Sequence, residues 1–317
     1  MTTTKRALGG SSLTLSPLVF GGNVFGWTAD KARSFALLDR FAEAGFETID
    51  TADVYSTWVP GNAGGESEAI IGEWMKARGN RDQINLITKV GMQMPDGQGL
   101  SAAWIEQAVE ASLRRLQTDR IDLYFSHVFD EVAPVEETLS AYDRLIKAGK
   151  VRAIGASNHT AEQLATALKA AADNGLPRYE ALQPQYNLYD RDGYDGALRD
   201  LALREGLGVI TYYSLASGFL TGKYRSQADL GKSPRGGGVA GYLNERGLRV
   251  LAALDAVAAE HQATPAEIAL AWLIAREGVT APIASATSLE QLDGLIRSTQ
   301  ITLTAGDITR LDQASAA

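Results

Sequence analysis

Four residues at the ends of short apolar segments carry the groups that a proton transfer needs. Asp50 and Tyr55 lie at and just beyond the end of segment 46–51, and Lys89 and His127 each end a later segment. A phenol is a weak acid at neutral pH, and a cation such as Lys89 favours its ionised form and eases proton donation. Asp50 would hold the lysine in place, and His127 would hydrogen-bond a carbonyl oxygen as it gains charge. These residue types therefore suit the reduction of a carbonyl group, with Tyr55 delivering the proton.

The four residues can act together only if the fold brings the ends of their segments to one place. Short apolar segments bounded by turn residues predict eight strands, and an alternating stretch around residues 9–12 predicts a small β-hairpin before the first of them. The predicted strands are 18–21, 46–51, 85–90, 121–127, 151–155, 181–185, 208–213 and 282–285.

An amphipathic helix is predicted after each strand as far as the seventh, where a long irregular insertion comes first. The predicted helices are one that starts at the Asp30 N-cap and stops at Gly45, then 67–77, 102–116, 135–148, 161–172, 196–205 and 248–260, and one that starts at the capping box 264–267. Alternating βα units specify a parallel sheet, and eight of them specify a closed (β/α)8 TIM barrel of the α/β class. We expect residues 1–317 to form this single domain. A doubly wound sheet is disfavoured because no G-x-G-x-x-G follows any strand.

In such a barrel the active site lies at the carboxyl ends of the strands. Seven polar residues fall at these predicted ends, which is what a catalytic and ligand-binding mouth requires. They are Asp50, Lys89, His127, Ser157, Asn158, Gln183 and Tyr213.

Composition excludes several other classes of function. Lys and Arg number 30 against 38 Asp and Glu, and the formal charge of −8 without basic runs argues against a nucleic-acid surface. The absence of cysteine excludes disulfides, thiolate metal sites and cysteine nucleophiles. The first ten residues lack the apolar core of a signal peptide, and no stretch reaches the roughly 18 apolar residues of a membrane span. We expect a cytoplasmic protein that does not insert into membranes.

Several motifs occur together, in one order, across almost the whole chain. They are the segments 45–55, 65–72, 88–89, 122–127, 149–158, 183–187 and 213–224. As a set they resemble the aldo-keto reductase family, including its relatives among potassium-channel β subunits. The resemblance implies an eight-stranded α/β barrel that binds a nicotinamide cofactor without a Rossmann motif and transfers hydride to an aldehyde or ketone.

The resemblance also implies residue roles. Tyr55 would be the proton donor, Lys89 and Asp50 the pair that tunes it, and His127 the group that orients the carbonyl. Tyr213 would stack on the nicotinamide, and Trp27 and Trp58 would form walls of the substrate pocket. The implied cofactor residues are Gly22, Asn23, Asp50, Ser157, Asn158, Gln183, Tyr213, Ser214, Leu215, Ala216, Gly218, Lys223, Arg235, Ser285, Thr287 and Gln291.

Residues 285–291 resemble the family's stretch that takes the adenosine 2′-phosphate and adenine, and the chain departs from the family pattern in and just after this stretch. Gly294 and Leu295 stand where many relatives have an acidic residue and an asparagine, and Ser285 stands where glycine is usual. Thr287, Ser288 and Gln291, with Arg235 or Arg297, would still hold a 2′-phosphate. NADP(H) is therefore the expected cofactor, with NAD(H) as the alternative.

Two other functions are compatible with the same residues. Lys89 at a strand end would also serve as the Schiff-base nucleophile of a lyase or aldolase. A regulatory subunit that binds the cofactor and turns over slowly is the second alternative.

Overall fold

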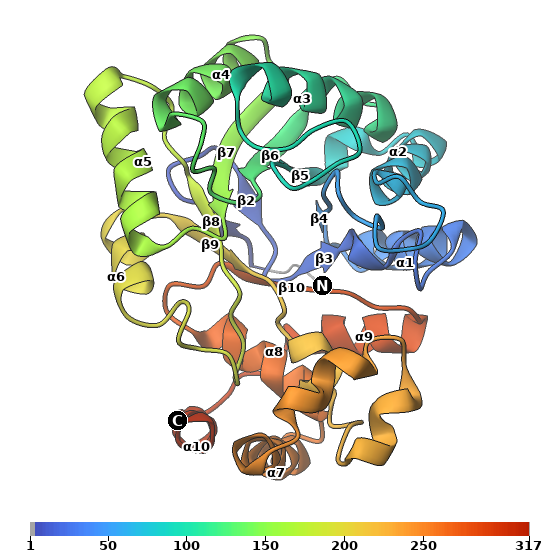
Figure 1. The fold of residues 1–317 in the computed structure, drawn as a ribbon. Coiled ribbons are helices and arrows are strands. Elements are labelled where there is room, and N and C mark those ends of the chain that lie inside the picture. The colour runs from blue at the N-terminus through green and yellow to red at the C-terminus, as the bar shows by residue number, and fades with distance from the viewer. Residues whose placement is uncertain (1–3, 317) are drawn as a thin grey trace.

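The computed structural model of the chain describes residues 4–316, and its centre is a closed barrel of eight parallel strands (Figure 1). The strands follow one another around the barrel in chain order, with the last beside the first. The predicted (β/α)8 TIM barrel is therefore confirmed. Its strands are β3 (Val19–Gly21), β4 (Thr48–Asp50), β5 (Asn85–Val90), β6 (Ile121–Ser126), β7 (Val151–Ser157), β8 (Ala181–Gln183), β9 (Gly208–Thr211) and β10 (Ala281–Ala284).

Helices surround the strands on every side in Figure 1. Within residues 4–316, none of them is both long and apolar enough to cross a membrane. The helices are α1 (Lys31–Glu43), α2 (Glu66–Arg78), α3 (Ala102–Leu116), α4 (Val135–Lys147), α5 (Ala161–Asn174), α6 (Ala197–Arg204), α7 (Glu245–Glu260), α8 (Pro265–Ala275), α9 (Leu289–Ser298) and α10 (Ala305–Ser315).

Some predicted boundaries were wrong for local reasons. Strand β8 ends at Gln183, two residues early, because Pro184 has no N–H to continue the ladder. Strand β9 ends at Thr211, two residues before the predicted end, and Tyr213 has a left-handed φ of 55° that is incompatible with a strand. Helix α7 starts three residues earlier than predicted, because the Asn244 side chain caps it by accepting from the Gly247 N–H.

The predicted hairpin is present and packs against the inside of the barrel. Strands β1 (Arg6–Ala7) and β2 (Thr14–Leu15) pair antiparallel. Leu8, Leu13 and Leu15 of this hairpin belong to the same buried cluster as the inward side chains of the barrel strands. The hairpin therefore covers the end of the barrel at which the strands begin.

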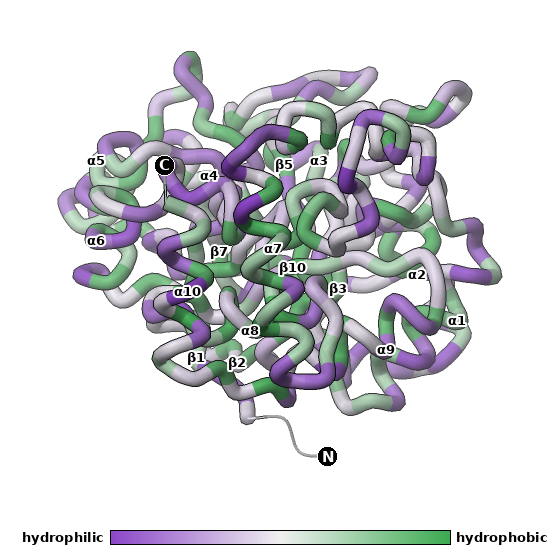
Figure 2. The backbone as a smooth tube through the Cα atoms, turned by 90° about the horizontal axis from the view of Figure 1, so that it is seen from below, coloured by the Kyte–Doolittle hydropathy of each residue, from purple (hydrophilic) through white to green (hydrophobic). Residues whose placement is uncertain are grey.

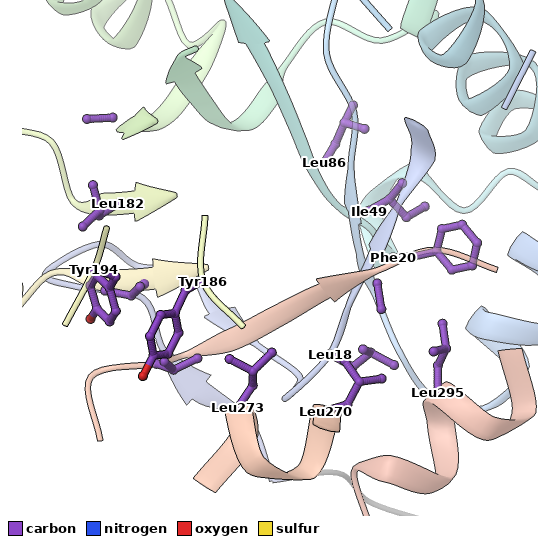
Figure 3. Close-up of a cluster of buried hydrophobic side chains, with 14 of the residues drawn as sticks. Leu18, Phe20, Ile49, Leu86, Leu182, Tyr186, Tyr194, Leu270, Leu273 and Leu295 are labelled. Atoms are coloured by element: carbon purple, nitrogen blue, oxygen red, sulfur yellow. The ribbon is translucent and has the colours of Figure 1, made fainter. Parts of the chain in front are cut away.

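Side chains alternate between the two faces of each barrel strand, as the pleat of a strand requires. Val19, Ile87 and Ile210 belong to the inner cluster. Their neighbours Phe20 and Leu86 belong to the larger cluster between strands and helices, which Figure 3 shows together with leucines of α8 and α9. Hydrophobic and hydrophilic residues alternate along the helices in Figure 2, as expected for helices with one buried face.

The same alternation points the polar strand ends inward. Asp50 follows the outward Ile49, and Lys89 lies two residues after the inward Ile87. Gln183 likewise lies two residues after the inward Ala181. Parallel strands place these positions at one end of the barrel. The fold thus collects the chemically important side chains in its interior at the carboxyl end of the sheet.

Helix α2 approaches α3 so closely that only glycine fits at one position. A Cβ atom on Gly72 would lie 2.3 Å from the carbonyl oxygen of Arg115 and 2.7 Å from Cα of Leu116. We predict that Gly72→Ala lowers the free energy of unfolding by about 1–3 kcal/mol, because the backbone clash outweighs the gain in helix propensity. Denaturant unfolding measures the change. Gly241→Ala is the control, since nothing lies within 4 Å of its Cβ position. A stability of Gly72→Ala equal to or above that of the wild type would contradict the prediction.

Candidate active site

Lys89 is the centre of a buried hydrogen-bond network at the carboxyl ends of β4 and β5. Its Nζ donates to Asp50 Oδ2 at 2.7 Å, to the Thr51 carbonyl at 2.6 Å and to the Tyr55 hydroxyl at 2.9 Å. Three acceptors match the three protons of an ammonium group. Burial lowers the pKa of Lys89, and the adjacent Asp50 carboxylate acts in the opposite direction. The network therefore fixes the lysine head and places Tyr55 beside it.

Asp50 is held from its other side by β7 and β8. Gln183 Nε2 donates to Asp50 Oδ1 at 2.9 Å, and Ser157 Oγ donates to the Gln183 carbonyl at 2.9 Å. Both oxygens of the buried carboxylate thus have partners. The structure brings Asp50, Tyr55, Lys89, Ser157 and Gln183 together as expected from their strand-end positions.

Asn158 and His127 are linked across the ends of β6 and β7. Asn158 has a left-handed φ of 55°, and its Nδ2 donates to the His127 carbonyl at 2.8 Å. The Tyr212 hydroxyl donates to Asn158 Oδ1 at 2.6 Å. Tyr212 was absent from the predicted site, although its place two residues after the inward Ile210 would have pointed to it. These contacts fix the amide of Asn158 from two sides.

His127 faces the tyrosine in a neutral form. The His127 and Tyr55 rings are 6.2 Å apart between centroids. Burial, together with the charge of Lys89, holds the pKa of His127 well below its usual value of 6.5. Its Nδ1 is buried without a hydrogen-bond partner among the described residues. A neutral imidazole donates one hydrogen bond and accepts one, so His127 can act as a neutral donor to a ligand oxygen.

Tyr55 is protonated at neutral pH in this site. Burial, and then the negative charge of Asp50, raise the pKa of Tyr55 well above its usual value of 10. The Tyr55 hydroxyl donates to Asp50 Oδ2 at 3.3 Å, which favours the neutral phenol. Lys89, which donates to the same hydroxyl at 2.9 Å, favours the phenolate that proton donation would leave.

A cavity of about 900 Å³ starts at these residues and continues along β9, β10 and α9. A volume of this size accommodates a ligand much larger than a simple carbonyl compound. The predicted residues that line it are Asn23, Asp50, Tyr55, Trp58, His127, Ser157, Asn158, Gln183, Tyr213, Ser214, Leu215, Gly218, Lys223, Arg235, Ser285, Thr287 and Gln291.

Three predicted ligand residues lie behind the cavity wall. Ala216 is fully buried, and Gly22 leaves no room for a side chain, because a Cβ would lie 2.8 Å from Ser67 Oγ. Trp27 packs edge-on against Trp58, with ring centroids 5.7 Å apart. Trp58 in turn lies 6.1 Å from the Tyr55 ring and is 47% exposed. Trp58 therefore forms the wall, and Trp27 supports it.

Arg235 offers the cavity a cation that has no ion-pair partner among residues 4–316. Its guanidinium lies 5.1 Å from the centre of the Trp27 ring, and its Nη2 is buried without a hydrogen-bond partner among the described residues. Burial lowers the pKa of Arg235, and the groups that oppose this are the phenols of Tyr213 and Tyr224. A buried cation is stabilised by an anionic partner, so this part of the cavity suits a phosphate or another anion.

The segment after β9 has the backbone geometry of a tight ligand loop. Ala216 and Ser217 have positive φ values of 48° and 56°, and the neighbouring Gly218 has a φ of 96°. Non-glycine residues in this conformation are uncommon and cluster at functional sites. Lys223 follows them and lines the same cavity. The loop thus supplies a cation and irregular backbone at one place.

The stretch after β10 is organised by its own side chains. Ser285 Oγ donates to Asn23 Oδ1 at 2.6 Å, which ties β10 to the loop after β3. The N–H and hydroxyl of Thr287 donate to Gln291 Oε1 at 2.9 and 3.1 Å. Ser288 caps α9 by accepting from the Gln291 N–H. The start of α9 is therefore a preformed polar corner of the cavity.

Asp53 is a buried carboxyl that strand-end reasoning missed. Its Oδ1 accepts from the Val54 N–H at 2.7 Å, and its Oδ2 has no partner among the described residues. Burial, and then the charge of Glu68, raise the pKa of Asp53 to about 8. Glu68 itself is held by Arg115 at 2.6 Å. Sequence offers no signal for such a group, because its raised pKa depends on tertiary burial and on the nearby charge of Glu68.

The protonated Asp53 makes stability depend on pH. A carboxyl whose pKa is raised from 3.8 to about 8 on folding contributes stability that is present below pH 3.8 and is lost as the pH rises through 8. We predict that Asp53→Asn removes this contribution. Between pH 5 and 8, wild-type stability should then fall relative to the variant by up to about 1.4 kcal/mol per pH unit. Urea unfolding across that range measures both slopes, and parallel curves would contradict the prediction.

Comparisons with known proteins agree with this geometry. The profile of the aldo/keto reductase family matches residues 17–316. The chain is 34% identical over 311 residues to the uncharacterized oxidoreductase YrpG of Bacillus subtilis, covering 93% of this chain and 91% of the relative. It is 32% identical to norsolorinic acid reductase stcV of Emericella nidulans, covering 95% and 79% of the two chains. It is also 33% identical to a probable voltage-gated potassium channel subunit beta of Oryza sativa, covering 90% and 88%. The chain therefore belongs to the aldo/keto reductase family and is an oxidoreductase.

Proposed function

We propose that the protein reduces aldehydes or ketones to alcohols with NADPH, and that Tyr55 donates the proton. The observation that carries the proposal is the position of Lys89, whose ammonium contacts Asp50 and the Tyr55 hydroxyl, two residues that line a large cavity. A family of oxidoreductases supplies the reaction class.

The protein residues divide the proton chemistry between them. Tyr55 is protonated at neutral pH and can donate its proton to a carbonyl oxygen that gains charge. The Lys89 ammonium stays hydrogen-bonded to the phenolate oxygen that results and stabilises its charge. His127 is neutral and donates a hydrogen bond to the same carbonyl oxygen, so it orients the substrate without competing as an acid.

The cavity suits a nicotinamide dinucleotide, which supplies the hydride when bound. Ser157, Asn158 and Gln183 would contact its carboxamide, and Tyr213, which is 51% exposed at the cavity, would offer its ring to the nicotinamide. Lys223 and Arg235, whose Nη2 has no hydrogen-bond partner in the described part of the chain, would hold phosphate groups. The hydroxyls and amide at the start of α9 would contact the 2′-phosphate, which favours NADPH over NADH. The positive end of the α9 helix dipole would also stabilise a phosphate bound there.

The substrate side of the cavity is apolar. Trp58, Val54 and Met92 line it near Tyr55 and His127. Aromatic and aliphatic walls with few convergent polar groups favour an apolar or aromatic carbonyl compound. We therefore propose small apolar or aromatic aldehydes and ketones as substrates.

A Schiff-base mechanism fits the same lysine poorly. A nucleophilic lysine needs a neutral amine with a free lone pair. The Lys89 Nζ instead has three acceptors within 2.9 Å, all of which favour the ammonium form. The contacts of Lys89 thus support a positioning role rather than covalent catalysis.

The proposal predicts a separable effect of the tyrosine hydroxyl. Tyr55→Phe should lower kcat for carbonyl reduction by about 10²–10⁴-fold, the usual size of a general-acid contribution, while NADPH binding stays within about twofold. Spectrophotometric turnover and fluorescence titration measure the two effects. Tyr194→Phe is the control, because it removes a buried hydroxyl that bonds to Gly278, outside the cavity.

The same titration tests the cofactor. Tighter binding of NADPH than of NADH to the wild type would support the 2′-phosphate assignment, whereas preference for NADH would overturn that assignment alone. Turnover of Tyr55→Phe close to the wild-type value would remove Tyr55 from the mechanism. Binding of neither nucleotide would overturn the proposed function.

A further inference from the structure

The far end of the cavity is built from α8 and α9. If the reactive ring of a dinucleotide lies beside Tyr55, as the proposed function requires, its adenosine part must extend toward the other end. That end is lined by Glu267 near the start of α8 and by Gly294 and Arg297 of α9. The inference below rests on the proposed function and concerns what this end of the cavity recognises.

Arg297 is held in place by a buried carboxylate. Its Nε and Nη2 donate to Glu267 Oε1 at 2.9 and 2.6 Å. Glu267 Oε2 accepts from the Thr264 N–H at 2.9 Å and completes the capping box of α8. The Glu267 side chain is 4% exposed, whereas the Arg297 side chain is 57% exposed. The carboxylate is therefore an anchor, and the guanidinium is the part that a ligand can reach.

Gly294 leaves this pair open to the cavity. A Cβ at Gly294 would lie 3.3 Å from Glu267 Oε1 and 3.6 Å from Arg297 Nη2. Any larger side chain there would project from α9 into the space beside the ion pair. The absence of a side chain at Gly294 therefore leaves space for a ligand beside the Arg297 guanidinium.

We propose that the Arg297 guanidinium, held by Glu267 and uncovered by Gly294, is the surface on which the adenine ring of the cofactor stacks. A guanidinium is planar and stacks on aromatic faces, including those of nucleobases. An arginine fixed by a second residue loses little entropy when it stacks. Arg297 is thus a specificity-determining residue for the adenosine part of the cofactor.

Two features favour the base over the 2′-phosphate as the partner of Arg297. Its charge is already balanced by Glu267, so the pair attracts an added dianion weakly and offers mainly a flat surface. Arg297 also lies in the last turn of α9, whereas Ser288 and Gln291 lie at the start of that helix, where its dipole favours negative charge. The phosphate and the base therefore have different places along one helix.

The test compares Arg297→Lys and Arg297→Ala with the wild type in fluorescence titrations with NADPH and with NADH. Lysine keeps a positive charge beside Glu267 but has no planar group. We expect both variants to weaken the binding of both nucleotides by a similar factor of roughly 5 to 30, as loss of a stacking contact predicts. Arg310→Ala is the matched control, since it breaks an exposed arginine–glutamate pair at 2.6 Å outside the cavity.

Gly294→Val provides a second route to the same contact and keeps both charged side chains, Glu267 and Arg297, in the sequence. The valine side chain should cover the Arg297 guanidinium and weaken the binding of NADPH and of NADH by a similar factor. Thermal unfolding of each variant shows that the fold is retained.

Three outcomes would overturn the proposal. In the first, Arg297→Ala weakens the binding of NADPH but not of NADH, which would assign the residue to the 2′-phosphate. In the second, Arg297→Lys binds both nucleotides like the wild type, which would make charge the relevant property. In the third, no variant changes binding. Each outcome leaves tight nucleotide binding by the wild type intact and so differs from a failure of the proposed function itself.

Discussion

A buried ammonium group cannot be left without acceptors, and this constraint on Lys89 shapes the whole site. The Lys89 side chain is fully buried and that of Asp50 is 1% exposed. An ion pair in such a place is stable only when the remaining protons and lone pairs are also bonded. Thr51, Tyr55 and Gln183 supply those bonds, so the ion pair determines where the phenol and the amide must lie.

The barrel makes this arrangement possible through the register of its strands. Asp50 pairs with Ile87, and Lys89 pairs with Phe125, so successive strand ends are staggered around one opening. The inward positions below them are apolar and are sealed by the leucines of the hairpin. One end of the barrel interior is therefore a packed core, and the other is polar and open to the cavity.

The features that could be predicted from the sequence are those that depend on local patterns along the chain, namely the strands, the helices and their order. The gathering of Asp50, Lys89 and Gln183 at one end of the barrel was predicted, because parallel strands place the carboxyl ends of successive βα units on the same side. The capping box of α8 and the hairpin were predicted for similar local reasons. The (β/α)8 barrel followed from the succession of these units.

Properties that depend on packing between distant elements could not be predicted. The direction of the Tyr55 pKa shift depends on how deeply the phenol is buried and on its contact with Asp50. The raised pKa of Asp53 depends on its burial and on the charge of Glu68 in α2. The position of Trp27 behind Trp58 depends on how two loops pack. Each of these is a tertiary effect without a signature in the spacing of residues.

The most direct test of the central claim is the single-turnover rate of NADPH oxidation by an aromatic aldehyde in Lys89→Met. Removing one partner of a buried ion pair is destabilising, so Asp50→Asn/Lys89→Met, which removes both charges, is measured beside it. Loss of the rate by more than about 100-fold in both variants, with NADPH still bound and thermal unfolding still cooperative, is the predicted result. A rate within threefold of the wild type in Lys89→Met would contradict the account, because the ammonium would then have no role in proton donation by Tyr55.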